Sequence, residues 1–242
     1  MIKTGTILAS FLLAACLSTH AVVKLPAIFS DGMVMQQQTN ANLWGTATPN
    51  KKVTVTTGWN DKQYVVTSDK NGAWKLTVST PEAGGPYALT FDDGSKKTLN
   101  NILIGELWLC SGQSNMEMPM KGFKNQPVEN ANRIRLFTVK RTSTFTPQND
   151  VIGSWKEATP VSVRDFSATA YYFGRLLNEI MDVPVGLVVA AWGGSACEAW
   201  MTADWLKAFP DAKIPQSEAD IKSKNRTPTV LYNGMLHPLI GM

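Results

Sequence analysis

Two different patterns of hydrophobic and polar positions divide the chain near residue 100. Over residues 22–100, short runs rich in β-branched residues alternate between apolar and polar positions, as half-buried strands do. These runs lie at 52–57, 63–67 and 73–78. Turn-forming Pro, Gly, Asn and Asp separate them, at 48–50, 69–72 and 83–86. Short strands at regular spacing predict a small β-sandwich over residues 22–100.

From about residue 101 the apolar runs become longer. Residues 102–110 and 185–191 are almost continuously apolar, which is expected for strands buried on both faces, and residues 133–139 predict another strand. Residues 168–181 predict an amphipathic helix, with Asp165 or Ser167 as its N-cap. Its apolar residues at helical spacing are Ala168, Tyr172, Leu176 and Ile180, flanked by Phe173 and Leu177.

Strands that alternate with helices predict a mainly parallel α/β sheet over residues 101–242. Ligands of such sheets bind beyond the carboxyl ends of the strands. This rule selects the loop after Cys110 and the loop after Ala191, and both contain Gly and Ser.

Composition and charge exclude several classes of protein. The 242 residues are 44% hydrophobic and 17% charged, which is ordinary for a globular protein and argues against long disorder. The net charge of +4 is spread thinly, without a run of five basic residues, so nucleic acid is not expected as a partner.

Residues 1–21 have the features of a secretory signal peptide: a basic start, a short apolar core, and small residues before Ala21. Cleavage after Ala21 would export the protein to the periplasm or the exterior, with no transmembrane segment left. A competing interpretation is a bacterial lipobox at 13–16, with Cys16 lipidated. Both interpretations predict export.

Cleavage after Ala21 leaves two cysteines and one histidine, namely Cys110, Cys197 and His237. Both cysteines adjoin apolar, strand-like runs, so two buried free thiols are favoured over a disulfide. With neither a CxxC motif nor a histidine cluster, we expect no zinc site and no other cofactor.

The loop after Cys110 has the elements of an acyl-transfer site. Gly112-Gln113-Ser114 places a hydroxyl just past a buried strand, and the backbone N–H of a serine at a helix start can stabilise developing negative charge. Gly193 and Gly194 in the second loop let another N–H approach a substrate oxygen. On these residues alone, an N-cap role for Ser114 and a turn at the glycines are the favoured interpretations. Ser111 and Cys110 are rival nucleophiles, although a cysteine at an apolar strand end is usually inert.

Five stretches, in order, resemble the sialate O-acetylesterase family of the SGNH hydrolases. They lie at 29–36, 105–117, 166–174, 192–201 and 231–239. The resemblance implies an N-terminal β-sandwich followed by a flavodoxin-like parallel-sheet hydrolase domain. The activity it implies is removal of O-acetyl groups from sugars, either sialic acid or acetylated polysaccharides.

The same resemblance implies roles for individual residues. Ser114 matches the nucleophile and one oxyanion donor, and Gly194, or else Gly193, matches the second donor. Gln113 and Asn115 flank the nucleophile and are candidates for shaping the turn or binding substrate. Glu198, together with Trp200, either lines the pocket or packs.

The family continues beyond these five stretches to a D-x-x-H segment that carries the general base and its orienting aspartate, whereas this chain ends at Met242. His237 matches a different block and is expected to be structural. We therefore expect a C-terminally truncated esterase, inactive by itself, with an open sheet edge and an uncovered apolar face.

A second hypothesis is a non-catalytic carbohydrate-binding or scaffold protein that uses Trp44, Trp59 or Trp74. No residue distinguishes among the acetylated sugars, and none specifies an oligomeric state.

Overall fold

The computed structural model describes residues 23–123 and 127–242. The predicted signal peptide, with Cys16 and the cleavage site after Ala21, lies outside the described residues. Within the described part of the chain, no helix is both long enough and apolar enough to cross a membrane.

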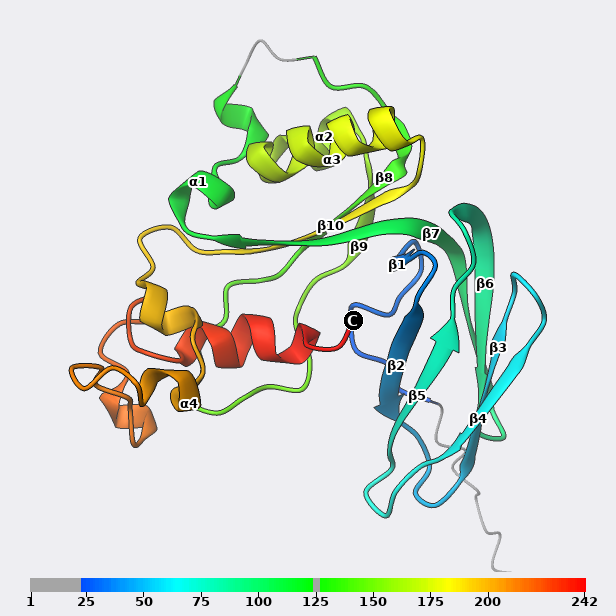
Figure 1. The fold of residues 1–242 in the computed structure, drawn as a ribbon, viewed down its shortest axis with the longest axis horizontal. Coiled ribbons are helices and arrows are strands. Elements are labelled where there is room, and N and C mark those ends of the chain that lie inside the picture. Colours follow the sequence, from blue (N-terminus) through cyan, green and yellow to red (C-terminus); the bar gives the residue numbers. More distant parts are fainter. Residues whose placement is uncertain (1–22, 124–126) are drawn as a thin grey trace, which may run out of the picture.

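The larger sheet has eight strands, and the long strand β7 (Lys96–Gly112) joins its two halves (Figure 1). One half is antiparallel, in the order β4 (Gln63–Thr67), β3 (Lys52–Thr57), β6 (Gly84–Asp92) and β7. The other half contains the parallel strands β7, β10 (Val185–Ala191) and β8 (Ala131–Thr138). Strand β9 (Trp155–Ala158) pairs antiparallel with β8, and β1 (Val34–Gln36) pairs parallel with β7.

A separate two-stranded sheet of β2 (Asn40–Thr46) and β5 (Ala73–Ser79) faces the antiparallel half. Side chains from both layers share one hydrophobic core, as Leu43, Val78 and Phe91 do. Strand β5 alternates strictly between exposed and buried positions, as its sequence predicts. Because β7 runs through residue 100 without a break, the division into units 22–100 and 101–242 stays a prediction.

The three tryptophans of the binding-module hypothesis have packing roles in this region. Trp74 is buried. Trp44 lies edge-on to Phe29, and Trp59 lies edge-on to Tyr87. These observations give each ring a packing role, and the carbohydrate-binding hypothesis stays a prediction.

Strand β10 lies between β7 and β8 and is buried at every position. Its successive side chains enter two different cores, because they point to opposite faces of the sheet. Leu187 and Val189 belong to the core beneath α2 (Pro160–Arg164) and α3 (Ala168–Met181). Val188 and Ala190 belong to the core shared with the C-terminal segment on the other face (Figure 1).

The remaining helical segments are short. They are α1 (Ser114–Glu117), α4 (Ala203–Leu206), a π-helical turn at Tyr232–Leu236, and 3-10 turns at Met120–Gly122, Cys197–Trp200, Glu218–Asp220 and His237–Leu239.

Helix α3 has its predicted bounds, and Ser167 is its N-cap, since the Ser167 side chain accepts a hydrogen bond from the N–H of Ala170. Asp165 instead ends α2. The predicted apolar stripe is wrong in part: Ala168 is buried and Tyr172 and Leu177 pack against the core, but Leu176 and Ile180 are 56% and 71% exposed. The fully buried positions are Ala168, Ala170, Tyr171 and Gly174, so the helix backbone approaches β10 closely at its small residues.

The mixed α/β fold with a mainly parallel hydrolase-type sheet is confirmed. One predicted turn differs, because residues 84–86 of the 83–86 segment begin β6. Beyond Gly105, β7 pairs only with β10 among the described strands. Exposed Trp108 and Leu109 lie on this part of β7, and Trp108 stacks edge-on against Phe173 of α3.

Candidate active site

The two loops selected by the sequence emerge side by side. Strands β7 and β10 are parallel neighbours, with Gly112 opposite Ala191 at their carboxyl ends. The N–H of Trp192 donates to the carbonyl of Gly112 at 3.1 Å and ties the loops together where they leave the sheet.

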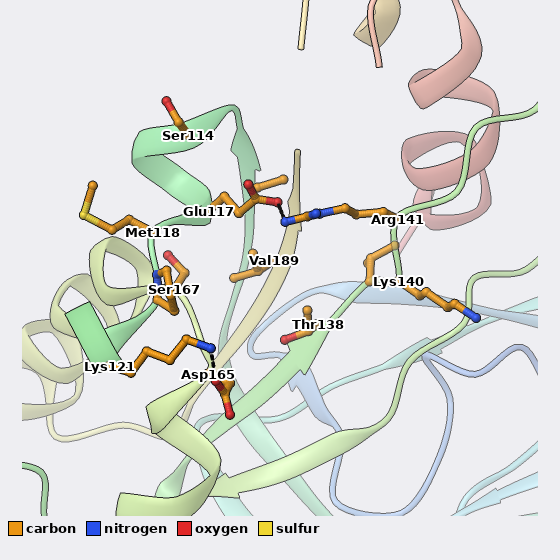
Figure 2. Close-up of a pocket in the computed structure, with 13 residues that line it drawn as sticks. Ser114, Glu117, Met118, Lys121, Thr138, Lys140, Arg141, Asp165, Ser167 and Val189 are labelled. Carbon is orange, nitrogen blue, oxygen red and sulfur yellow. Dashed lines mark hydrogen bonds and ion pairs between the residues drawn. The ribbon is translucent and has the colours of Figure 1, made fainter. Parts of the chain in front are cut away.

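Ser114 is the first residue of α1, directly after the turn that follows β7. Gln113 occupies the N-cap position, so the alternative in which Ser114 is merely the cap is wrong. Ser114 is exposed, and Figure 2 shows its side chain at the outer end of α1. The hydroxyl is therefore accessible to a substrate.

Three hydrogen-bond donors converge on the side-chain oxygen of Gln113. Its Oε1 accepts from the backbone N–H of Ser114 at 3.0 Å and from the Ser114 hydroxyl at 2.9 Å. The N–H of Gly194 points at the same atom, at 3.4 Å. The Gln113 oxygen is an amide carbonyl oxygen, so donors from both loops meet at one carbonyl oxygen.

The two glycines of the second loop are required for different reasons. Gly194 has φ +70°, in the left-handed region that favours glycine. Gly193 has no positive φ, but a Cβ there would lie 2.6 Å from Oε2 of Glu117, so a larger residue would displace the Glu117 carboxylate. The N–H of Gly193 donates to that same Glu117 oxygen at 2.8 Å.

Glu117 and Arg141 are site residues that the sequence analysis missed. The other carboxylate oxygen of Glu117 forms an ion pair with Arg141, whose guanidinium lies 5.8 Å from the centre of the Trp192 ring. A signal for Arg141 was available, because it follows the predicted strand 133–139. The rule that selected the other two loops applies equally to the carboxyl end of β8.

A cavity of about 490 Å³ extends from Ser114 along the carboxyl ends of β8 and β10 (Figure 2). An exposed ion pair between Lys121 and Asp165, 2.7 Å long, lies on its wall. The hydrogen bond from Lys121 is the main reason that the pKa of Asp165 is lowered. The lining residues are Ser114, Glu117, Met118, Pro119, Lys121, Thr138, Val139, Lys140, Arg141, Asp165, Ser167, Val189 and Ala191.

Of the predicted site residues, only Ser114 is among the described residues that line this cavity; Gln113, Asn115, Gly193, Gly194 and Glu198 are not. The carbonyl oxygen of Asn115 accepts from the Thr169 hydroxyl at 2.9 Å, which joins α1 to α3. The side chain of Glu198 is exposed, and its carbonyl oxygen accepts from the N–H of Thr229 at 2.9 Å. Their predicted substrate contacts stay predictions.

The two cysteines are free thiols, but only Cys110 is buried. Burial raises the pKa of the Cys110 thiol from 9.0 to about 11, so this rival nucleophile is almost entirely protonated at neutral pH. The prediction that Cys197 is also buried is wrong, because Cys197 starts an exposed 3-10 turn after the glycine loop.

His237 lies at a different cavity, of about 660 Å³, whose walls include Trp44, Trp74 and Asp150. Its Nδ1 is 2.9 Å from the carbonyl oxygen of Gln148. No histidine is found among the described residues that line the Ser114 cavity. Within residues 23–123 and 127–242, no group of three or more His, Cys, Asp or Glu side chains is arranged to hold a metal ion.

Comparison with known proteins gives a consistent result. The family model for carbohydrate esterases of the sialic acid-specific acetylesterase type matches residues 104–232. The sialate O-acetylesterases of Pongo abelii and Homo sapiens are 30% and 29% identical to this chain over 90% of its length and 46% of theirs. The crystal structure of a carbohydrate acetylesterase from Xanthomonas citri superposes with a TM-score of 0.79 at 37% identity, covering 90% of this chain and 48% of that one.

The chain thus spans about half the length of the curated relatives it matches. The family match covers more than half of this chain and includes both loops that converge on the Gln113 oxygen. The chain belongs to the sialic acid-specific acetylesterase family of carbohydrate esterases.

Proposed function

We propose that these residues form part of a carbohydrate esterase that removes O-acetyl groups from sugars, with Ser114 as the nucleophile. The observation that carries the proposal is the convergence of the Ser114 and Gly194 N–H groups on one carbonyl oxygen, that of Gln113. Two N–H groups directed at one carbonyl oxygen beside a serine hydroxyl are the donor arrangement of an oxyanion hole. The acetyl and sugar specificity follows from the family.

The reaction begins when the acetyl carbonyl oxygen of the substrate replaces the Gln113 oxygen. Ser114 Oγ attacks the carbonyl carbon, its proton passes to a general base, and the carbonyl electrons move onto the oxygen held by the two N–H groups. Collapse of this intermediate breaks the bond to the sugar oxygen, which receives the proton from the base. Water then hydrolyses the acetyl-enzyme by the same steps and releases acetate.

In this proposal the second oxyanion donor is Gly194 rather than Gly193, which two hydrogen bonds support. The N–H of Gly193 is already bonded to Glu117, whereas the N–H of Gly194 points at the position of the oxyanion. The two candidates left open by the sequence thus receive different roles in the proposal.

The proposal takes the general base from a D-x-x-H segment beyond Met242, as the family resemblance implies. The Ser114 hydroxyl is bonded to Gln113, and His237 lies at the other cavity. Assaying the 242-residue chain tests this part, with little or no hydrolysis expected. If the 242-residue chain is fully active and His237→Ala abolishes that activity, the base lies within this chain.

The proposed substrate is an O-acetylated sugar, either sialic acid or a polysaccharide, and the proposed location is outside the cytoplasm. Acetate release from O-acetylated sialic acid and from acetylated xylan, measured side by side, distinguishes the two sugars. N-terminal sequencing of the exported protein tests cleavage after Ala21 against lipidation at Cys16.

The decisive test is acetate release by the longest reading frame that contains these residues, compared with its Ser114→Ala variant. We expect the variant to lose activity by about 10⁴-fold or more, because an ester cannot be attacked without the nucleophile. Its circular dichroism spectrum should be unchanged, since Ser114 is exposed. Undiminished acetate release by the folded variant would end the assignment.

A further inference from the structure

We propose that Glu117 is a positioning residue that fixes the glycine loop against the helix carrying the nucleophile, and that Arg141 neutralises its charge. The inference rests on the proposed function, because the loop matters through the N–H of Gly194. Glu117 lies on α1 three residues after Ser114, so one short helix carries both the proposed nucleophile and the contact that places its second oxyanion donor.

The contact between Glu117 and Gly193 lies one residue before the proposed oxyanion donor, the N–H of Gly194. Glu117 Oε2 accepts from the N–H of Gly193, and the following peptide, between Gly193 and Gly194, carries the N–H that points at Gln113 Oε1. The carbonyl oxygen of that peptide accepts from Asn225 Nδ2 at 3.0 Å. Because N–H and C=O point in opposite directions in a trans peptide, holding the oxygen directs the N–H toward the oxyanion position.

The fit at Glu117 leaves little freedom. The side chain of Glu117 is only 26% exposed, and a Cβ on Gly193 would lie 3.7 Å from the Cα and Cβ of Ser114. The carboxylate therefore fills the space over Gly193, beside the nucleophile. Small displacements of a donor from its productive geometry are costly in catalysis, so a group that restricts the loop contributes to rate.

A carboxylate beside a developing oxyanion needs a counter-charge. Arg141 supplies it, since its guanidinium pairs with the second Glu117 oxygen and lies over the Trp192 ring, one residue before the glycines. Removing one partner of a partly buried ion pair leaves the other uncompensated. The pair thus anchors the loop while its net charge stays near zero.

Kinetics of p-nitrophenyl acetate hydrolysis by the longest reading frame containing these residues tests the role. We expect Glu117→Ala to lower kcat by about 10- to 100-fold, somewhat less than the loss of an oxyanion donor itself, with KM within about threefold. Glu117→Gln should retain kcat within about fivefold, because its amide oxygen can accept the same N–H. Asp204→Ala, which removes an exposed ion pair with Lys207, is the matched control and should match the wild type.

A second measurement does not depend on activity. Amide hydrogen exchange in the 242-residue chain should be about tenfold faster or more at Gly193 in Glu117→Ala, because that N–H loses its acceptor. Exchange should stay slow in Glu117→Gln and in Asp204→Ala. Protection that is unchanged in Glu117→Ala would overturn the positioning role.

The outcomes separate this inference from the proposed function. If the longest reading frame shows no Ser114-dependent hydrolysis, the proposed function fails. Amide hydrogen exchange at Gly193 in the 242-residue chain still decides whether Glu117 fixes the loop. If Glu117→Ala does not fold, Arg141→Ala replaces it. This variant keeps the Gly193 contact and should lower kcat about five- to tenfold, whereas an unchanged kcat would contradict the role of the pair.

Discussion

At the scale of single residues, Gln113 joins the two loops of the candidate site. Its side-chain oxygen accepts hydrogen bonds from the N–H groups of Ser114 and Gly194, all three residues being exposed. The same oxygen also accepts a hydrogen bond from the Ser114 hydroxyl, so in the proposed reaction an ester would have to displace it before Ser114 transfers its proton. These contacts of the Gln113 side chain were not predictable from its position in the sequence.

Replacing Gln113 by glutamate should strengthen the hydrogen bonds that hold this side chain at the proposed oxyanion position. A carboxylate accepts the same hydrogen bonds with charge assistance, which makes them roughly twice as strong. We expect Gln113→Glu to slow fluorophosphonate labelling of Ser114 by about tenfold or more. Gln113→Ala, which also loses the α1 cap, controls for destabilisation of the helix. Equal labelling rates for wild type and Gln113→Glu would contradict this account.

The two thiols should differ sharply in reactivity. Burial raises the pKa of Cys110 to about 11, so at pH 8 roughly one molecule in 10³ carries its thiolate, which is the reactive form. Peptide mass spectrometry after iodoacetamide treatment at pH 8 should find exposed Cys197 modified and Cys110 intact. Modification of Cys110 should increase as the pH approaches 11 or on unfolding. Equal modification of both thiols in the folded protein at pH 8 would show that Cys110 is accessible.

At the scale of elements, the sequence predicted several strands and the longest helix, because apolar alternation and buried runs report directly on burial, whereas β1, β2, β6, β9, α2 and α4 were missed. Strands β3, β4 and β10 and helix α3 have their predicted bounds. The buried face of α3 was predicted only in part, since a search for large apolar residues overlooks small buried positions such as Ala170 and Gly174. The long span of β7 was missed because its first part carries polar residues at an antiparallel edge.

Close packing of α3 on β10 reverses the usual effect of a helix glycine. Gly→Ala within a helix ordinarily stabilises by up to about 1 kcal/mol. A Cβ at Gly174 would lie 2.5 Å from Leu187 Cδ1, inside a buried core. We expect Gly174→Ala to lower the free energy of unfolding by about 1–2 kcal/mol through overpacking, measured by urea denaturation. Leu176→Ala, on the exposed side, should change it by no more than about 0.5 kcal/mol, and a stabilised Gly174→Ala would refute the close contact.

At the scale of the whole molecule, the candidate site combines segments far apart in sequence. The carboxyl ends of β7, β8 and β10 supply Ser114, Arg141 and Gly194, and Asn225 arrives from the C-terminal region. Topological rules predicted the meeting of the first and third of these segments. The side-chain contacts of Glu117, Arg141 and Asn225 were not predictable, because they depend on how loops without regular periodicity fold over one another.

Several large apolar side chains are exposed on the surface of the described fold. Trp108 and Leu109 on β7, with Phe173, Leu176 and Ile180 on α3, are large apolar side chains left exposed. Trp108 and Phe173 are in edge-on contact, and adjoining apolar residues on a surface commonly mark a contact with further protein. The chain spans about half the length of the curated relatives it matches.

Covalent labelling of Ser114 tests the central claim most directly. The longest reading frame containing these residues is treated with a fluorophosphonate, whose phosphoryl oxygen would occupy the oxyanion position when the serine displaces fluoride. Peptide mass spectrometry should find one adduct, on Ser114, and none in the folded Ser114→Ala variant. An adduct on Ser111 or another residue, or no adduct on Ser114 in the folded wild-type protein, would contradict the account.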